Sequence, residues 1–438
     1  MHDGAVDLKA EARARIYAQP IETLDPAQPE LFATDAMWPI FERLRAEDPV
    51  HWVEAPDYGG YWSITRWNDI MAVDSNHGVF SSADGITLQS LESKAETARR
   101  GTRPSFISMD PPRHDEQRKT VSPAVAPSNL QVMGPVIRER AGQILDALPI
   151  GKEFDWVEHV SKELTAMTLA TLFDFPQDER GLLPFWSDMM TNAPGHGPVE
   201  SWEHKRVVLD EMVARFTGLW NERVNAPPTG DLISMMAHGE STRNMDRMEY
   251  SGNLGLLIIG GNDTTRNTIS GSVYALNKNP GEYAKLRANP ALVPSMVSET
   301  IRWQTPLAHM ARTATADCEL GGKTIKAGDR VVMWYVSGNR DASMVEDPDR
   351  YIIDRARPRQ HMSFGFGIHR CVGNRLAELQ LTIIWEEIMK RFPSIDLVTE
   401  PDRTHSIFVK GYETLPVVIP SRNTLFRPAD RSAVSPPP

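Results

Sequence analysis

Apolar positions repeat with helical spacing along most of this chain, and only a few segments alternate as strands do. Residues 38–46 (WPIFERLRA) and 374–392 (NRLAELQLTIIWEEIMKRF) space their apolar side chains three and four positions apart, which predicts helices. Several amphipathic helices are expected over residues 136–220. Residues 49–54 (PVHWVE) and 60–66 (GYWSITR) predict two strands joined by a Pro-Asp and Gly-Gly turn. The pattern favours a mainly helical fold with a small β region.

The longest helical pattern covers residues 245–277 and contains a weak point. Gly260 and Gly261 are poor helix formers, and the hydroxyl of Thr264 can bond back to the carbonyl of Gly260. A site of this kind predicts a kinked helix with a groove that admits a ligand or water. A close crossing with another helix would explain the two glycines equally well.

Some segments show neither periodicity. Residues 79–106 are rich in Ser, Gly and Thr, and a loop of that length inside a compact domain is usually functional or mobile. Residues 1–20 predict a flexible lead-in, and residues 421–438 predict a disordered tail. Although 438 residues could form two or three domains, we expect a single domain over residues 21–420.

Composition narrows the functional classes. The net charge of −11 argues against a general nucleic-acid binder, which needs an excess of Lys and Arg. The richest apolar run, LGLLIIGG, is far too short to cross a bilayer, and the N-terminus lacks the apolar core of a secretory signal. We therefore expect a cytoplasmic protein without a membrane span.

The chain has only two cysteines, Cys318 and Cys371, which excludes a disulfide scaffold and an iron–sulfur cluster with four thiolates. Cys371 lies in the glycine-rich stretch 363–373 (SFGFGIHRCVG), whose backbone can approach a large flat group. A helix begins just after it, and the helix dipole favours a negative sulfur there. An inert buried thiol is the usual fate of a single cysteine. A thiol hydrolase that pairs Cys371 with His369 is conceivable, but residues two apart rarely orient as nucleophile and base.

The same stretch resembles a known family. Phe364, Gly367, His369, Cys371 and Gly373 match the haem-binding loop of the cytochrome P450 family, whose cysteine is the axial iron ligand. The resemblance extends over about residues 35–420. It implies a triangular, mainly α fold with a small β region, in which haem b lies between the long kinked helix and the cysteine loop. Phe364 and Gly373 would then contact the haem, and Cys371 would bind its iron.

Residues 260–265 (GGNDTT) match the oxygen-activating segment of that family. The resemblance implies that Gly260 lies against the haem and that Asp263 and Thr264 are catalytic. Cleavage of the O–O bond requires two protons, which a carboxylate and a hydroxyl can deliver. A haem sensor or a peroxide-dependent enzyme would not need the Asp263–Thr264 pair.

Further matches concern groups that would surround the haem. His114 and Arg118 lie four apart after an Asp-Pro-Pro sequence, and taken alone they indicate a solvated helix face. By resemblance these two residues, together with Arg312 and His369, contact the haem propionates, because buried carboxylates need cationic partners.

Glu299 and Arg302 lie three apart and would ordinarily form a surface ion pair. The resemblance instead implies a buried structural triad of Glu299, Arg302 and Arg355 that anchors the cysteine loop. The spacing from Arg355 to Phe364 is one residue longer than usual in the family, so Arg357 competes for the third place.

Longer strings indicate a subfamily. LLIIGGNDTTRN, ETIRWQTPLAHMARTA, MWYVSGNRD and SFGFGIHRCVGNRLAELQL resemble the bacterial group that hydroxylates the terminal carbon of medium-chain alkanes and fatty acids. A related bacterial steroid side-chain hydroxylase is the alternative. The resemblance implies a substrate pocket lined by Leu256, Ile259, Leu307, Ala308, Phe408 and Val409.

We expect no flavin domain in this chain, and if the protein is a redox enzyme we expect its electrons to come from another polypeptide. The resemblance implies a ferredoxin and an NAD(P)H-dependent ferredoxin reductase. We expect the ferredoxin to dock on basic residues near the cysteine loop, namely Arg113, Lys119, Arg370 and Arg375.

Overall fold

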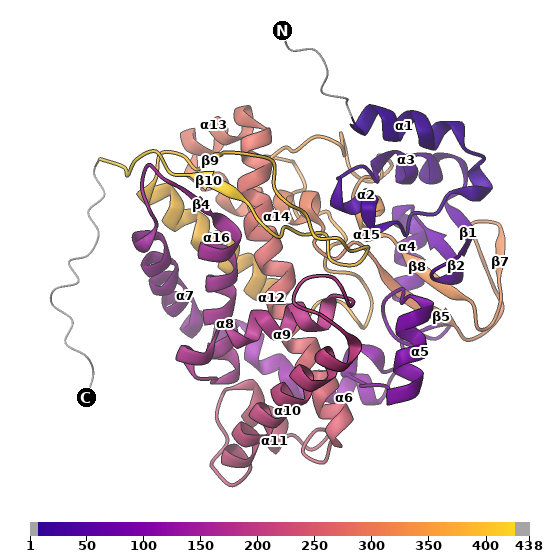
Figure 1. The fold of residues 1–438 in the computed structure, drawn as a ribbon, viewed down its shortest axis with the longest axis horizontal. Coiled ribbons are helices and arrows are strands. Elements are labelled where there is room, and N and C mark those ends of the chain that lie inside the picture. The colour runs from indigo at the N-terminus through magenta and orange to yellow at the C-terminus, as the bar shows by residue number, and fades with distance from the viewer. Residues whose placement is uncertain (1–7, 425–438) are drawn as a thin grey trace.

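Helices make up most of the computed structural model, which describes residues 8–424 (Figure 1). The helices are α1 (Leu8–Ala18), α2 (Pro29–Ala33), α3 (Trp38–Glu47), α4 (Trp67–Ser75), α5 (Leu91–Arg100), α6 (Arg113–Val121), α7 (Pro127–Ala147), α8 (Glu163–Phe173), α9 (Leu182–Thr191), α10 (Trp202–Val224), α11 (Leu232–His238), α12 (Arg247–Lys278), α13 (Pro280–Ala288), α14 (Val293–Gln304), α15 (Tyr335–Gly338) and α16 (Asn374–Arg391). The strands are β1 (Val50–Ala55), β2 (Gly59–Ile64), β3 (Phe80–Ser81), β4 (Glu153–Asp155), β5 (Met310–Ala314), β6 (Cys318–Leu320), β7 (Lys323–Ile325), β8 (Arg330–Met333), β9 (Asp396–Leu397) and β10 (Pro416–Val418).

Helix α12 is the centre of the helical part. It packs against α8, α9, α14 and α16, and most of its side chains are buried. The Asp246 side chain caps its first turn by accepting a hydrogen bond from the amide of Glu249 at 2.9 Å. The long helix predicted over residues 245–277 is confirmed, with its first and last residues shifted by only one or two positions. It stays α-helical through Gly260 and Gly261.

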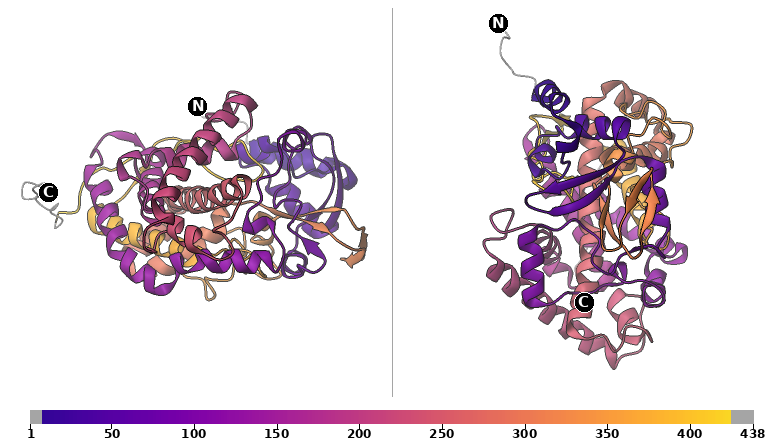
Figure 2. Two further views of the ribbon diagram at one scale, coloured as in Figure 1. Left: turned by 90° about the horizontal axis from the view of Figure 1, so that it is seen from below. Right: turned by 90° about the vertical axis from the view of Figure 1, so that its right-hand side faces the viewer.

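The β region is divided between the right-hand side of the molecule, where β1, β2, β5 and β8 lie, and the helical side, where β4, β9 and β10 lie (Figure 1). Its largest sheet has the strand order β1-β2-β8-β5-β3, in which β2 and β8 are parallel and the other pairs antiparallel. The right-hand view of Figure 2 shows its strands side by side in front of the helices. The predicted hairpin is confirmed, since Ala55 pairs with Gly59 across its turn. The mainly α fold with a small β region is confirmed as well.

Two predictions for polar segments were wrong in part. Helix α1 packs against α3 and buries Ala12 and Ile16, so residues 8–18 are not a flexible lead-in. Residues 91–100, expected within a loop, form helix α5, whose N-cap Ser90 accepts a hydrogen bond from the amide of Ser93. The sequence pattern does not predict helix α5, because its helix-forming residues are mostly charged or small and show no apolar period.

The C-terminal end is also ordered further than expected. Arg422 donates to the carbonyl of Asp146 at 2.8 Å, and the amide of Asn423 donates to the carbonyl of Arg391 at 2.7 Å. These bonds hold the first residues of the predicted tail against α7 and α16. Residues 1–7 of the lead-in and residues 425–438 of the tail lie outside the described part of the chain.

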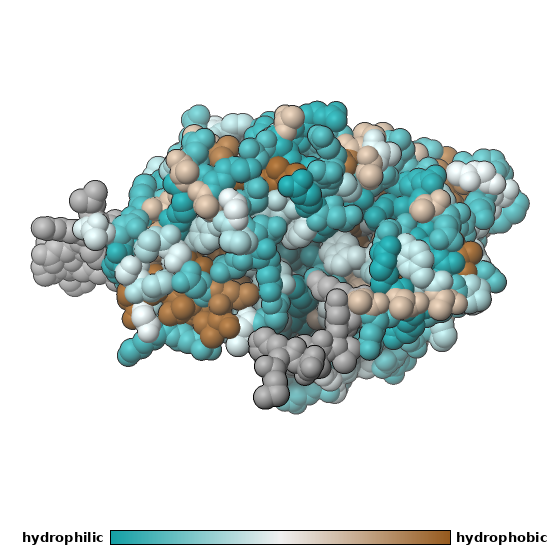
Figure 3. Space-filling model, turned by 90° about the horizontal axis from the view of Figure 1, so that it is seen from above, coloured by the Kyte–Doolittle hydropathy of each residue, from teal (hydrophilic) through white to brown (hydrophobic). Residues whose placement is uncertain are grey.

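Most of the large apolar side chains are buried, and the surface is correspondingly polar. The face shown in Figure 3 is largely hydrophilic, with apolar side chains in separate patches. Within residues 8–424, no helix combines the length and the apolar character needed to cross a bilayer.

Candidate active site

A cavity of about 1090 Å³ lies between α12 and the glycine-rich loop at residues 363–373. Cys371 and His369 line it from the loop, and Gly260 and Thr264 line it from α12. The structure therefore brings together the two motifs that the sequence places about a hundred residues apart.

The cysteine loop is held in a tight turn. Gly365 and Gly367 have positive φ angles of 65° and 63°, and a Cβ on Gly367 would lie only 2.5 Å from the carbonyl oxygen of Asp74. The amide of Cys371 donates to the carbonyl of Phe364 at 2.8 Å. This turn leaves Cys371 exposed to the cavity.

Although Cys371 faces the cavity, the protein around it desolvates the thiol and raises its pKa, and the amide of Gly373 and the guanidinium of Arg118 partly oppose that effect. These groups favour a thiolate, but they do not overcome the desolvation, so the thiol stays protonated at neutral pH. A metal ion bound to the sulfur would supply the missing positive charge.

One buried carboxylate that the sequence analysis missed holds the loop in place. Asp74, near the end of α4, accepts hydrogen bonds from the amide of Phe366 at 2.7 Å and the hydroxyl of Tyr335 at 2.6 Å. Its other oxygen accepts from the Arg312 guanidinium at 2.8 Å. No sequence signal marks Asp74, since a lone acid in an ordinary helix pattern is usually exposed.

The residues expected around the propionates lie near one another. The rings of His114 and His369 are 4.4 Å apart between centroids, and His369, Arg118 and Arg312 line the cavity. Burial and the nearby Arg312 lower the pKa of His369 to about 3, so its ring is neutral.

Several polar atoms at this position have no partner. Among residues 8–424, both ring nitrogens of His369 and the Nε2 of His114 are buried without a hydrogen bond. Buried polar groups are normally paired, so unpaired nitrogens beside two arginines indicate a place for an anionic ligand group.

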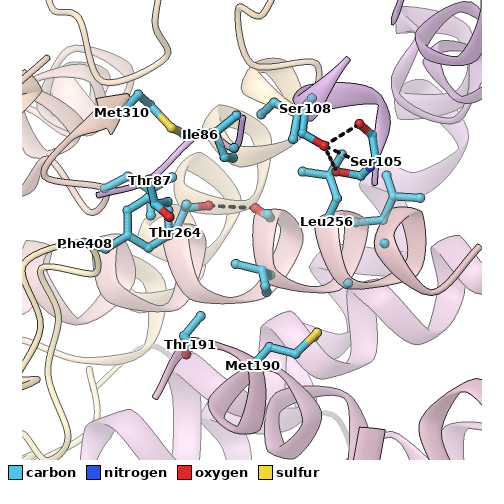
Figure 4. Close-up of a pocket in the computed structure, with 18 of the residues that line it drawn as sticks. Ile86, Thr87, Ser105, Ser108, Met190, Thr191, Leu256, Thr264, Met310 and Phe408 are labelled. Atoms are coloured by element: carbon cyan, nitrogen blue, oxygen red, sulfur yellow. Dashed lines mark hydrogen bonds between the residues drawn. The ribbon is translucent and has the colours of Figure 1, made fainter. Parts of the chain in front are cut away.

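On the opposite wall, Thr264 and Asp263 have different surroundings. Thr264 faces the cavity, and its hydroxyl donates to the carbonyl of Gly260 at 2.8 Å, the back-bond predicted from the sequence (Figure 4). Asp263 is fully buried behind it and does not line the cavity. One Asp263 oxygen accepts from Ser187 and Asn262, whereas the other has no partner among the described residues.

A buried ion pair connects Asp263 toward the surface. The Arg266 guanidinium lies 3.1 Å from an oxygen of Asp263 and 2.6 Å from an oxygen of Asp188 on α9. The Asp188 side chain is 20% exposed, while that of Asp263 is not exposed at all. Burial raises the pKa of Asp263, and Arg266 opposes the rise. No sequence motif marks Asp188 or Ser187, because only the packing of α9 on α12 brings them to this position.

The structural triad forms as expected. Arg302 donates two hydrogen bonds of 2.8 Å to the carboxylate of Glu299, and Arg355 donates one of 2.9 Å. The Arg357 side chain forms no ion pair or hydrogen bond within residues 8–424, so the third place belongs to Arg355. The three side chains are almost fully buried.

Only four of the six residues predicted to line the substrate pocket do so. Leu256, Ile259, Leu307 and Phe408 line the cavity, whereas Ala308 and Val409 do not and are buried in the core instead. Both segments are extended, as shown by the bridge between Leu307 and Val409 and the bond from the Ala308 amide to the Phe408 carbonyl. Side chains alternate in direction along an extended chain, so Ala308 and Val409 point away from the space that Leu307 and Phe408 face.

Other lining residues were not predicted. Figure 4 shows them around α12, and they are Ile86, Thr87, Ser105, Ser108, Met190, Thr191 and Met310. Ser108 donates its hydroxyl to the carbonyl of Ser105, and Thr191 donates to that of Ser187. Because these hydroxyls already have backbone partners, they do not demand a polar ligand. The loop composition of residues 79–106 was the only signal for part of this set.

Comparisons with known proteins agree with the geometry. The family model for Cytochrome P450 matches residues 200–413. Linalool 8-monooxygenase from Pseudomonas putida is 35% identical over 405 residues, which cover 91% of this chain and 99% of that protein. This chain belongs to the cytochrome P450 family.

Two solved P450 structures are similar over most of their length. Cytochrome P450-153 from Novosphingobium aromaticivorans is 44% identical with a TM-score of 0.83, over 90% of this chain and 99% of that one. CYP153D17 from Sphingomonas sp. PAMC 26605 is 47% identical with a TM-score of 0.84, over 90% of this chain and 98% of that one. The P450 fold and monooxygenase class expected from the sequence are confirmed.

The residues present fit the haem of a P450. Among residues 8–424, no group of three His, Cys, Asp or Glu side chains could hold a metal ion. A Cβ added to Gly260 or Gly373 would meet no atom within 4 Å, which leaves room for a flat group between them. The unpaired nitrogens of His114 and His369, together with Arg118 and Arg312, are polar groups of the kind that anionic propionates would need.

Proposed function

We propose that this P450 uses O₂ and two electrons to hydroxylate the terminal carbon of medium-chain alkanes or fatty acids. One oxygen atom enters the C–H bond, and the other leaves as water with two protons. The observation that carries the proposal is the apolar wall formed by Leu256, Ile259, Leu307 and Phe408 beside Thr264. The resemblance of the motifs to bacterial terminal hydroxylases and the similarity to two P450-153 structures support it.

Terminal attack has to be imposed by shape. A methyl C–H bond is stronger than the neighbouring methylene bonds, so an unrestrained chain would react in its interior. The four apolar side chains would admit a chain end and exclude its middle from the reacting position. Each methylene that leaves water adds about 0.8 kcal/mol to binding, so several chain lengths should be accepted.

The haem, proposed as haem b, supplies the oxygen-activating chemistry when it is bound. Cys371 would bind its iron, and His114, Arg118, Arg312 and His369 would bind its propionates. Thr264 would hold a proton at its hydroxyl in the cavity. Asp263 would receive protons from outside through the neighbourhood of Arg266 and Asp188, because it is closed off from the cavity itself.

A ferredoxin and its NAD(P)H-dependent reductase would supply the electrons, with all three proteins in the cytoplasm. The residues proposed for docking, Arg113, Lys119, Arg370 and Arg375, are all exposed. Arg113 and Lys119 belong to α6, which carries His114 and Arg118, and Arg370 and Arg375 flank Cys371. Their position near the cysteine loop supports a docking face for an acidic partner.

The test is product analysis of the haem-loaded enzyme with a ferredoxin, its reductase and NADH. Octane, dodecane and dodecanoic acid are supplied in turn, and the alcohols are separated by gas chromatography. Terminal alcohols are expected. Mainly mid-chain alcohols would contradict terminal hydroxylation and leave only the monooxygenase class, and turnover without a ferredoxin would contradict the electron route.

A further inference from the structure

The mouth of the cavity carries two cations that lack a carboxylate partner. Arg103 follows α5, Lys205 lies in the first turn of α10, and both line the cavity. Within residues 8–424, neither forms an ion pair with an Asp or Glu. Lys205 donates to the carbonyls of Met190 and Asn192, at 2.9 and 2.8 Å, and its ammonium lies 5.6 Å from the centre of the Trp202 ring.

The other charged side chains at the mouth are satisfied elsewhere. Arg100 pairs with Glu96, and Arg206 pairs with Glu203 and Asp210. Glu92 accepts a hydrogen bond from the indole of Trp202. The available carboxylates are therefore engaged, and the two unpaired cations remain directed to the same space.

The two cations are also close enough to affect each other. Burial lowers the pKa of Lys205 to about 8, and the charge of Arg103 lowers it as well. Two neighbouring like charges at the edge of an apolar cavity are unfavourable without an anion between them. A carboxylate would remove the repulsion and make charge-assisted hydrogen bonds to both.

We propose that Arg103 and Lys205 form a carboxylate-binding subsite that holds the head group of a medium-chain fatty acid while its terminal methyl lies beside Thr264. This inference rests on the proposed terminal hydroxylation, and it selects fatty acids over alkanes as the better-bound substrates.

The dimensions of α12 are consistent with such a chain. A Cβ on Gly252 would lie 2.6 Å from the carbonyl oxygen of Arg103, so the Arg103 segment crosses α12 at Gly252. From residue 252 to residue 264 the helix rises by twelve steps of about 1.5 Å, or about 18 Å. Carbon–carbon bonds of about 1.5 Å at tetrahedral angles advance an extended chain by about 1.25 Å per carbon. The whole span corresponds to about 14 carbons, and a hydrogen bond of about 2.8 Å between the carboxylate and its donor reduces that number to about 12.

The test is a binding titration of the haem-loaded enzyme that follows the spin-state change of its absorption spectrum. The ligands are dodecanoate, methyl dodecanoate and 1-dodecanol. All three have the same carbon chain, but only dodecanoate is negatively charged. Arg103→Met is the main variant, because the Arg103 side chain forms no hydrogen bond or ion pair within the described residues. Lys205→Met and Lys205→Arg follow, and thermal melting checks that loss of the two carbonyl bonds leaves Lys205→Met folded.

Arg103→Met and Lys205→Met should each weaken dodecanoate binding about 3- to 10-fold, the range of a partly exposed ion pair. Binding of the ester and the alcohol should be unchanged, and Lys205→Arg should keep dodecanoate affinity. Arg99→Met is the matched control, because Arg99 lies on α5 beside the mouth but does not line the cavity. It removes the same charge and should have no effect.

Equal weakening of acid and ester, or no weakening of the acid, would overturn the subsite. Those outcomes leave the proposed function intact if the wild-type enzyme still converts 1-dodecanol and dodecane at their terminal carbons. Mid-chain oxidation by the wild-type enzyme would instead contradict the proposed function, whatever the titrations show.

Discussion

The buried carboxylate of Asp74 binds the guanidinium of Arg312, with 2.8 Å between Oδ1 and Nη2. Asp74 belongs to α4 and Arg312 to β5, so their contact joins a helix to the sheet directly beside the cysteine loop. Through its other oxygen Asp74 also holds the amide of Phe366 in that loop. One carboxylate thus positions both the arginine expected at the haem propionate and the loop that carries Cys371.

Replacing Asp74 should therefore loosen the haem. Asp74→Ala removes the buried carboxylate that pairs with Arg312, and breaking a buried pair costs about 3–5 kcal/mol of folding free energy. We expect a lower unfolding midpoint and faster transfer of haem from the variant to an apoprotein acceptor. Asn68→Ala, an exposed change on the same helix, is the control and should do neither. If haem left Asp74→Ala at the same rate as it leaves the wild-type protein, Asp74 would not position the haem site.

The two cysteines provide a matched pair for the iron ligand. Cys371→Ser should abolish the thiolate-type spectrum of the carbon monoxide complex, because serine does not supply a thiolate to the iron. Cys318→Ser should keep that spectrum, since Cys318 lies in the β6–β7 hairpin away from the cavity. A normal spectrum from Cys371→Ser would show that the site is wrongly assigned.

Active-site residues that lie in short local motifs could be predicted from the sequence. Residues that reach the site through long-range contacts could not. Cys371, Thr264 and the Gly260 back-bond could be predicted because each lies in a short motif with its own chemistry or geometry. Asp74, Asp188 and Ser187 could not, because their roles arise only when α4 and α9 pack against other elements. The prediction that Ala308 and Val409 line the pocket was wrong for a different reason, because both lie in short extended segments whose side chains alternate in direction. Arg355 was distinguished from Arg357 only by the folded path of the loop.

The triad provides a stability test with an internal control. Arg355→Met removes one of two guanidinium groups from the fully buried Glu299, which should lower the free energy of unfolding by about 3 kcal/mol. Arg357→Met should change it by less than about 0.5 kcal/mol, because its side chain has no partner in the described residues. Denaturant unfolding of both variants is the measurement. Equal effects would mean that Arg355 does not anchor the loop.

The different surroundings of Thr264 and Asp263 predict different defects. Thr264→Ala removes the only one of the two side chains that faces the cavity, so the variant should still bind substrate and consume NADH but release hydrogen peroxide. Thr264→Ser keeps the hydroxyl and should stay largely coupled. Asp263→Asn should slow turnover more than it uncouples it, because it impairs proton supply from behind. Oxygen, NADH and product are measured together, and normal coupling in Thr264→Ala would contradict the proposed proton route.

His309 links two loops over the cavity and should make stability depend on pH. Its Nε2 accepts from the amide of Leu88 and its Nδ1 bonds the carbonyl of Ile407, each at 3.0 Å, and Leu88 and Ile407 both line the cavity. Accepting at Nε2 requires a neutral ring. Burial lowers the pKa of His309 to about 4.

His309 therefore binds a proton less readily in the folded state than in the unfolded chain, where its pKa is about 6.5. The contribution of His309 to stability is complete above about pH 6.5 and is lost as the pH falls toward 4, by an amount on the order of 3 kcal/mol. His309→Gln can accept and donate the same two bonds without titrating, so its free energy of unfolding should fall less steeply between pH 7 and pH 5. His361 and His369, whose pKa values are lowered to about 3, remain in both proteins and contribute equally. Urea unfolding at several pH values measures both slopes, and identical slopes would exclude His309 as a source of acid sensitivity.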